Sequence, residues 1–153
     1  MVGHTGGMPS EAADALKSVA LATAPTLASA GFKKRRNAFN RTTEAGVVQV
    51  LSFQMDKPAR GAASAGPARR FNVNLGVYIH DDGDGATPPS WVNDGDCQLR
   101  QSVAELVPDG PDAHLALDDV DLASWATFHV LSMYALPWLD ERRTRAQVLA
   151  ARD

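Results

Sequence analysis

The sequence predicts an α+β fold: an antiparallel sheet of three to five strands, with helices from the N-terminal and C-terminal parts of the chain packed on one face. The strongest observation is strict alternation of apolar and polar residues over residues 70–79, which is typical of a strand with one buried face. Residues 47–54 form a second apolar run of strand length. Helical spacing of apolar residues follows Ser10 and Asp121, on either side of these runs.

The inward face of the predicted sheet consists of the apolar members of these strands. They are Phe39, Leu51, Phe53, Phe71, Val73, Leu75 and Val77. Residues 70–79 are expected to form the central strand, and Gln49 is a polar exception on the inward side of its neighbour. Residues 43–46 predict a hairpin turn, because Gly46 can adopt a positive φ.

The length of 153 residues predicts a single domain over residues 10–153, preceded by a disordered Gly-rich tail over residues 1–9. A hydrophobic fraction of 44% and a charged fraction of 22% are typical of a globular protein. No apolar run approaches the about 18 residues that a membrane span needs. Cys97 is the only cysteine, so an intrachain disulfide is excluded, and we expect a cytoplasmic protein.

We expect the N-terminal helix to begin at an N-cap, Ser10, and to end at Gly31. Pro25 should kink or split this helix, because it removes a backbone donor and clashes one turn back. Residues 16–30 resemble the end of a secretory signal, but two acids precede them, which favours an ordinary amphipathic helix.

The clearest helix should be capped by Asp121 and run to about Ala135. Its broad apolar face comprises Leu122, Trp125, Phe128, His129, Leu131 and Met133. We expect Trp125 and Phe128 to pack against the sheet, and His129 to be a core histidine. Residues 136–139 should break this helix, and Asp140 should cap a last short helix that ends near Ala151.

Two loops and one ambiguous segment complete the chain. Residues 56–69 predict a flexible connection, and residues 80–96, dense in Asp, Gly and Pro, predict a surface loop. Residues 97–107 fit a helix by propensity, whereas a fourth strand would fit an antiparallel meander.

Several short segments occur in order along the chain: Gly31-Phe32-Lys33-Lys34, Phe39-Asn40-Arg41, Val48-Gln49-Val50-Leu51-Ser52-Phe53-Gln54, Phe71-Asn72-Val73-Asn74-Leu75-Gly76-Val77-Tyr78, Cys97-Gln98-Leu99-Arg100 and Tyr134-Ala135-Leu136-Pro137-Trp138-Leu139. With these segments the sequence resembles the bacterial domain-of-unknown-function family 4304 (DUF4304), over about residues 14–140. The resemblance implies a small α+β domain with a strand near Arg100, so we expect residues 99–106 to form a strand. It implies no reaction.

A basic run from Lys33 to Arg36, continued by Arg41, is flanked by two phenylalanines and suggests contacts to phosphates. The alternative is a solvated hairpin arm in which both phenylalanines are buried. The net charge of −3 argues against a dedicated nucleic-acid binder, as do 14 acidic and 5 basic residues over residues 80–153. Nucleic-acid binding through residues 33–41 therefore remains a weaker alternative.

Metal and catalytic chemistry have little support in the sequence. Residues 81–85 are rich in Asp but lack the spacing and the final Glu of a calcium loop, so a solvated turn is favoured. No catalytic or cofactor-binding motif is present, and we assign no catalytic residue, metal or cofactor. An enzyme or small-ligand cleft near Tyr78, His80 and Cys97 remains an alternative.

The polar face of the paired strands is the main candidate site. It would present Ser52, Gln54, Asn72, Asn74 and Tyr78 in adjacent rows, with Asn40 as a further neighbour. Asn is depleted in strands, and solvent exposure alone does not require it. Gly76 would leave a bare spot for a ligand or another backbone. We therefore expect a non-enzymatic binding or interaction protein whose partner is a protein or a small polar ligand, not a membrane.

Overall fold

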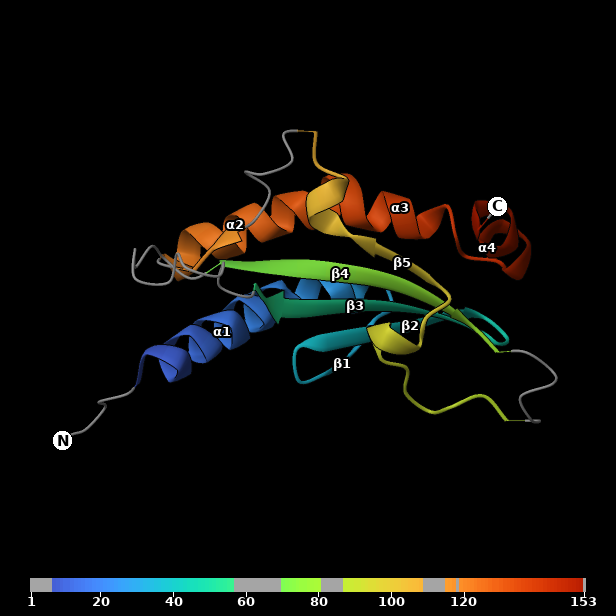
Figure 1. Ribbon diagram of the computed structural model, residues 1–153, viewed down its shortest axis with the longest axis horizontal. Helices are drawn as coiled ribbons and strands as arrows, with labels where there is room; N and C mark the ends of the chain where they lie inside the picture. Colours follow the sequence, from blue (N-terminus) through green and yellow to red (C-terminus); the bar gives the residue numbers. More distant parts are fainter. Residues whose placement is uncertain (1–6, 57–69, 81–86, 109–114, 118, 153) are drawn as a thin grey trace, which may run out of the picture.

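The structure is a computed structural model that describes residues 7–56, 70–80, 87–108, 115–117 and 119–152. Its main feature is an antiparallel sheet whose strands follow one another in chain order (Figure 1). The strands are β1 (Lys33–Arg35), β2 (Ala38–Glu44), β3 (Val47–Met55), β4 (Arg70–Ile79) and β5 (Leu99–Ser102), and a two-residue strand, β6 (Leu115–Ala116), also pairs with β4. The predicted α+β class is confirmed, with β4 as an interior strand.

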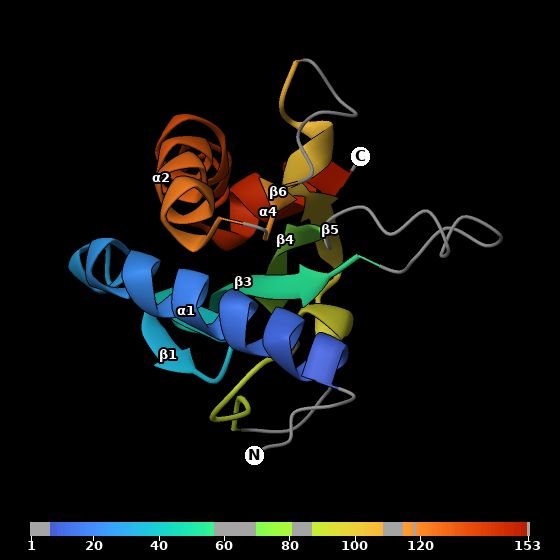
Figure 2. The same cartoon turned by 90° about the vertical axis from the view of Figure 1, so that its left-hand side faces the viewer.

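The helices lie mainly at the two ends of the chain. They are α1 (Gly7–Ser29), α2 (Val120–Val130), α3 (Leu136–Asp140) and α4 (Arg145–Arg152), with a π-helix (Leu131–Ala135) between α2 and α3. Helices α1 and α2 lie side by side on the same side of the sheet (Figure 2). None of the described helices is both long and apolar enough to cross a membrane.

Helix α1 passes through Pro25 without a break, so a split at this residue is wrong. Pro25 is exposed, and Leu27, which follows it, is fully buried and holds the next turn against the core. The helix begins at Gly7, three residues before the predicted N-cap, and residues 1–6 of the predicted tail lie outside the described part. Gly31 ends the helix as predicted, with φ at 98°.

A tight turn divides the segment after α1 into two strands, β1 and β2. Arg36 occupies this turn with φ at 58°, a conformation that few residues other than glycine adopt. The three-residue strand β1 therefore becomes an edge strand beside β2. The next hairpin has the predicted turn, with Gly46 at a φ of 81°.

The predicted inward face of the sheet is confirmed as the centre of the core. Leu51 on β3 lies opposite Phe39 on β2 and opposite Leu75 on β4. All seven predicted residues are at most 3% exposed and belong to one cluster with residues of α1 and α2. Period-two alternation thus identified the buried side of each strand correctly.

The side of α2 that faces the core is not the side predicted from the sequence. Trp125 and Phe128 are 66% and 48% exposed, and His129 is exposed as well. The side chains that face the core are smaller: Ala123, Thr127, Val130 and, after the helix, Leu131. Small side chains let α2 pack closely against its neighbours, whereas two large aromatic rings would hold it away.

The limits of the C-terminal helices also differ from the prediction. Asp119, not Asp121, caps α2 by accepting a hydrogen bond from the Leu122 amide at 3.1 Å. The chain stays helical through the expected break, because α3 follows the π-helix directly. Asp140 is the last residue of α3 and does not cap α4, which begins at Arg145.

The π-helix explains how one row of side chains stays buried from α2 to α3. Every fourth residue is buried along the stripe Ala123, Thr127, Leu131, Ala135 and Leu139. In an α-helix each four-residue step overshoots a full turn by about 40°, so such a stripe would rotate off the core. A π-helical turn contains more residues and offsets this drift.

Candidate functional site

The face of the sheet away from α1 and α2, called the outward face here, carries the predicted polar residues in register. Ser52 on β3 lies opposite Asn74 on β4, and Asn74 lies opposite Ser102 on β5. Gln54 lies opposite Asn72 at the same end of the strands. The predicted set thus forms adjacent rows, with Tyr78 at the other end of β4.

A segment that we expected to be a solvated loop crosses this face. Val92 is 1% exposed and packs with Val48, Val50 and Cys97 in a second, smaller core. Asn40 on β2 fixes the segment, because its Nδ2 donates to Val92 O at 3.0 Å and its Oδ1 accepts from Val92 N at 2.9 Å. In the sequence, the apolar pair Trp91-Val92 within a polar stretch was the signal that this segment covers part of the outward face.

The bare spot at Gly76 is filled by Cys97. A Cβ atom on Gly76 would lie 2.6 Å from Cys97 Sγ, closer than real contacts allow. Burial, followed by the charges of Asp94 and Asp96, raises the pKa of the Cys97 thiol to about 12. The thiol therefore stays protonated at neutral pH, and its role is to pack against β4.

The alternative site near Tyr78, His80 and Cys97 has two hydrogen-bonded contacts. His80 Nδ1 lies 3.2 Å from the hydroxyl of Tyr78, and Cys97 Sγ donates to Asn93 O at 3.6 Å. None of the hollows described below is lined by Tyr78, His80 or Cys97. A protonated thiol is a poor nucleophile, so this arrangement gives no support to cysteine-based catalysis.

A carboxylate bridges two strands across the outward face. Asp94 accepts from Gln54 Nε2 on β3 at 3.3 Å and from Arg100 Nη2 on β5, also at 3.3 Å. Asn72 Nδ2 donates to the hydroxyl of Ser102. Three of the five predicted site residues, Gln54, Asn72 and Tyr78, are therefore engaged within the protein. Ser52 and Asn74 line hollows.

Two hollows lie next to each other beside Trp91, which lines both. The larger, of about 440 Å³, is lined by Arg35, Arg36, Asn37, Ala38, Ser52, Trp91 and Asn93. The second, of about 330 Å³, includes Lys33, Asn40 and Ser90 in its lining. A third hollow, of about 260 Å³, lies across the sheet and is lined by Asn74, Arg100 and Glu105 among others.

The charged side chains that line the two hollows beside Trp91, among the described residues, are all basic. Lys33, Arg35 and Arg36 contribute to the two neighbouring hollows, and no Asp or Glu that the structure describes lines either of them. The Arg35 guanidinium lies 4.6 Å from the centre of the Trp91 ring, a cation–π contact that holds both side chains at the rim. Residues 33–36 are exposed, and Phe32 and Phe39 are buried. Both observations agree with the alternative of a solvated hairpin arm.

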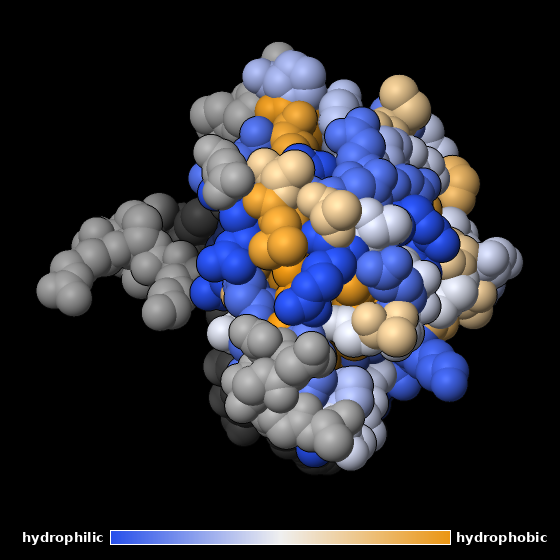
Figure 3. Space-filling view, turned by 90° about the vertical axis from the view of Figure 1, so that its right-hand side faces the viewer, coloured by the Kyte–Doolittle hydropathy of each residue, from blue (hydrophilic) through white to orange (hydrophobic). Residues whose placement is uncertain are grey.

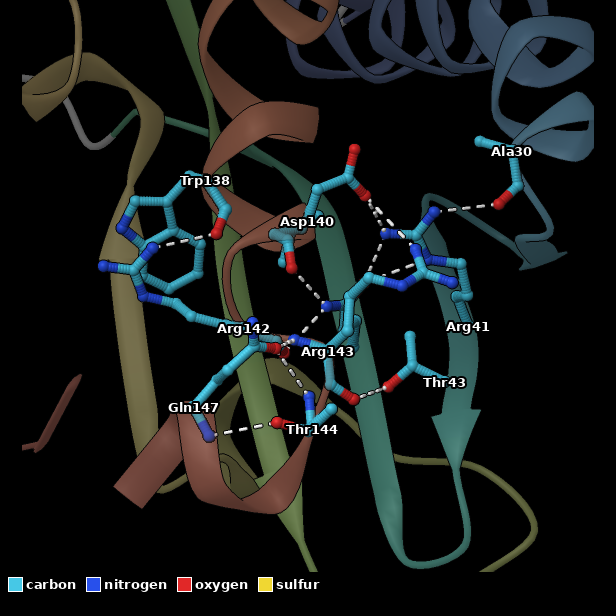
Figure 4. A network of polar contacts seen from close by, with 11 residues as sticks. Ala30, Arg41, Thr43, Trp138, Asp140, Arg142, Arg143, Thr144 and Gln147 are labelled. Atoms are coloured by element: carbon cyan, nitrogen blue, oxygen red, sulfur yellow. Dashed lines mark hydrogen bonds and ion pairs between the residues drawn. The ribbon is translucent and has the colours of Figure 1, made fainter. Parts of the chain in front are cut away.

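Arg41 does not belong to this basic surface. It is 7% exposed and points into the core on the other side of the sheet. Its Nη2 lies 3.0 Å from Asp140 Oδ1 and its Nη1 donates to Ala30 O at 2.9 Å (Figure 4). Burial lowers the pKa of Arg41, and the hydrogen bond with Asp140 opposes that shift. We therefore correct its assignment from a phosphate contact to a core residue that holds the end of α3.

The end of the molecule near α4 is held by further polar contacts. Thr43 Oγ1 donates to Arg143 O at 2.5 Å, and Glu44 accepts from the Arg145 amide at 2.8 Å. The surface at this end is mostly hydrophilic, with scattered patches of hydrophobic residues (Figure 3). These contacts tie the C-terminal segment to the β2–β3 hairpin and do not form a hollow with the basic residues.

Metal binding is not suggested by the described part of the chain, in which no three His, Cys, Asp or Glu residues group at a metal-binding distance. The predicted Asp-rich turn, residues 81–85, lies outside the described residues.

The comparisons with known proteins bear on the whole domain. The family model described as "Domain of unknown function (DUF4304)" matches residues 23–141, which include every strand and helices α2 and α3. Neither the curated proteins nor the solved structures contain a significant match.

Proposed function

Since the chain belongs to the DUF4304 family, whose description assigns no activity, we propose a function from the outward face itself: a non-enzymatic binding domain that holds an acidic segment of a partner protein beside Trp91. The observation that carries this proposal is the pair of hollows that share Trp91 and that, within the described part of the chain, are lined by Lys33, Arg35 and Arg36 and by no acidic side chain.

The side chains around these hollows suit a peptide that carries carboxylates. A guanidinium presents paired N–H donors that match the two oxygens of a carboxylate, and Arg35 and Arg36 each offer one. Asn37, Ser52 and Asn93 lie among them and provide amide and hydroxyl groups for the polar backbone of a peptide. The lining therefore combines charge attraction with directional hydrogen bonding.

A protein segment fits this surface better than a nucleic acid. Single-stranded nucleic acids are held by successive bases stacked on several aromatic rings. Of the residues that the structure describes, Trp91 is the one aromatic residue that lines these hollows, and its ring contacts Arg35. The position of Arg41 in the core further shortens the basic surface. The net charge of −3 also disfavours a polyanion as long as a nucleic acid.

The basic residues have a second physical role, which the experiment must separate from binding. β1 is an edge strand, and charged side chains on edge strands prevent unwanted strand pairing. Preventing strand pairing at this edge requires charged side chains along β1 alone. It does not require the amide-lined hollow that extends to Ser52 on β3 and to Asn93.

Binding of a labelled Glu-rich peptide, measured by fluorescence anisotropy at low and high salt, tests the proposal. The double variant Arg35→Gln/Arg36→Gln should weaken binding by roughly tenfold or more, because charge-assisted hydrogen bonds are lost. Lys17→Gln/Arg152→Gln is the matched control, since it removes the same charge from exposed positions on α1 and α4.

Two results would contradict the proposal. One is equal loss of affinity in the control variant, which would show a response to net charge alone. The other is tighter binding of a single-stranded oligonucleotide than of the peptide, which would show that the site binds nucleic acid in preference to an acidic protein segment. Asn93→Ala in the unchanged basic background should weaken the peptide complex without changing its salt dependence, because it removes hydrogen bonding but no charge.

A further inference from the structure

Helix α2 has a second apolar face, which points away from the core. Leu122 is 62% exposed, Trp125 66%, Phe128 48% and Met133, in the following π-helix, 56%. Asp121 is the only Asp, Glu, Lys or Arg between residues 120 and 136. A surface helix normally carries charged residues on its solvent side, and a helix that is apolar on both sides is normally buried on both.

From this face we infer that the protein forms a symmetric dimer in which α2 packs antiparallel against α2 of a second copy. We define the α2 stripe as Leu122, Trp125, Phe128 and Met133. Exposed apolar groups that form a continuous row mark interaction surfaces. The stripe lies on the side of the molecule opposite the hollows beside Trp91, so the dimer and the proposed binding site do not compete.

The size of the stripe matches the centre of a dimer interface. Since an aromatic side chain buries roughly 150–250 Å² in full, the exposed parts of the four side chains together offer on the order of 400 Å². Stable interfaces bury about 800 Å² on each partner and have an apolar centre with a polar rim. The stripe supplies this centre, and the neighbouring surfaces of α1 and α2 would supply the rim.

The order of residues along the stripe is compatible with a two-fold axis. With the axis beside Thr127 and Phe128, Leu122 of one copy lies opposite Met133 of the second copy, and the reverse contact is identical. Trp125 then approaches the Phe128–His129 region of the second copy. Within one chain Trp125 and His129 are already stacked, with ring centres 5.9 Å apart and planes at 8°, and present a flat surface.

Electrostatics also favour a second copy in this orientation. Asp121 lies near one end of the stripe, so an antiparallel arrangement keeps the two Asp121 side chains at opposite ends of the interface. Antiparallel helices further place the positive end of one helix dipole near the negative end of the other.

Sedimentation velocity of the full chain over a wide range of protein concentrations tests the dimer. The unchanged protein should move from monomer to dimer as its concentration rises, and Trp125→Glu should raise the dimer dissociation constant by at least roughly tenfold. Leu149→Glu is the matched control, because Leu149 is 45% exposed on α4, away from the stripe, and should leave the dissociation constant unchanged.

A cysteine cross-link locates the interface independently of affinity. Phe128→Cys should form a disulfide between two copies under mild oxidation, whereas Leu149→Cys should not, and the buried Cys97 should not react in either. A protein that remains monomeric at all concentrations would overturn the inference. So would a dimer that persists unchanged in Trp125→Glu, or one that is cross-linked through Leu149→Cys instead of Phe128→Cys.

Discussion

Arg41 and Gln49 lie opposite each other on β2 and β3, and two N–H groups of the guanidinium donate to Gln49 Oε1 at 2.9 and 2.6 Å. Gln49 is fully buried, and its Nε2 donates to Leu139 O at 2.6 Å and to Arg142 O at 3.0 Å. This pair therefore satisfies the carbonyl groups at the end of α3 and joins the C-terminal segment to the middle of the sheet.

Replacing Gln49 by Ala should lower the free energy of unfolding by about 3 kcal/mol, because Arg41 and two carbonyl groups lose buried partners at once. Urea denaturation monitored by circular dichroism measures the effect. Gln54→Ala, an exposed position on the same strand, is the control and should change stability by less than about 0.5 kcal/mol. Equal effects at the two positions would contradict a structural role for the pair.

Gly76→Ala should destabilise the protein by about 1–3 kcal/mol, because the added methyl group overlaps Cys97. The overlap involves both Sγ and Cβ of Cys97, at 2.6 and 2.9 Å, so Cys97→Gly should relieve it. In a double-mutant cycle by urea denaturation, the two changes together should cost less than the sum of their separate effects. Strict additivity would show that the close approach is not the cause.

Thr127→Val should raise the free energy of unfolding by about 1 kcal/mol, because the fully buried Thr127 hydroxyl has no hydrogen-bond partner among the described residues. Thr23→Val is an informative comparison, since the Thr23 hydroxyl donates to Val19 O at 3.2 Å and to Ala20 O at 3.1 Å. That variant should be neutral or less stable. Thermal unfolding of both variants distinguishes them, and a loss of stability in Thr127→Val would contradict the unpaired hydroxyl.

The stability of the protein should depend on Cys97 at high pH. The thiol pKa rises from its ordinary value of 9.0 to about 12 on folding, so the unfolded chain loses this proton first as the pH increases. The contribution of the thiol to stability is therefore constant below pH 9 and falls between pH 9 and 12. The difference in unfolding free energy between the protein and Cys97→Ala, measured across this range, should shrink as the pH rises, and a constant difference would contradict the shift.

Much of the sheet could be predicted from the sequence, because alternation along a strand is a local property. The buried rows on β3 and β4, the turn at Gly46 and the stop at Gly31 all follow from residue types within a few positions. The short β1–β2 turn was missed because its key residue, Arg36, has no preference for a positive φ.

Less of the candidate site could be predicted. The sequence located Ser52 and Asn74 on the outward face, but Asp94 and Trp91 reach that face only through a segment with no regular periodicity. The basic run was noted from its composition, yet Arg41 was grouped with it. Its alternation with its neighbours places it on the inward face opposite Gln49, and two polar residues at facing inward positions were the available signal.

The sequence by itself determined the fold class, the two long strands β3 and β4 and the inward face of the sheet, since a hydrophobic period of two can be satisfied only by burying one side of each strand. Only the tertiary structure decided which apolar face of α2 is buried, because both faces satisfy the helical period and the choice depends on how closely α1 approaches. It also decided that Asn40 and Cys97 hold a cover over part of the outward face. These contacts join residues far apart in the chain, where the free energy depends on packing and hydrogen-bond geometry that no local pattern encodes.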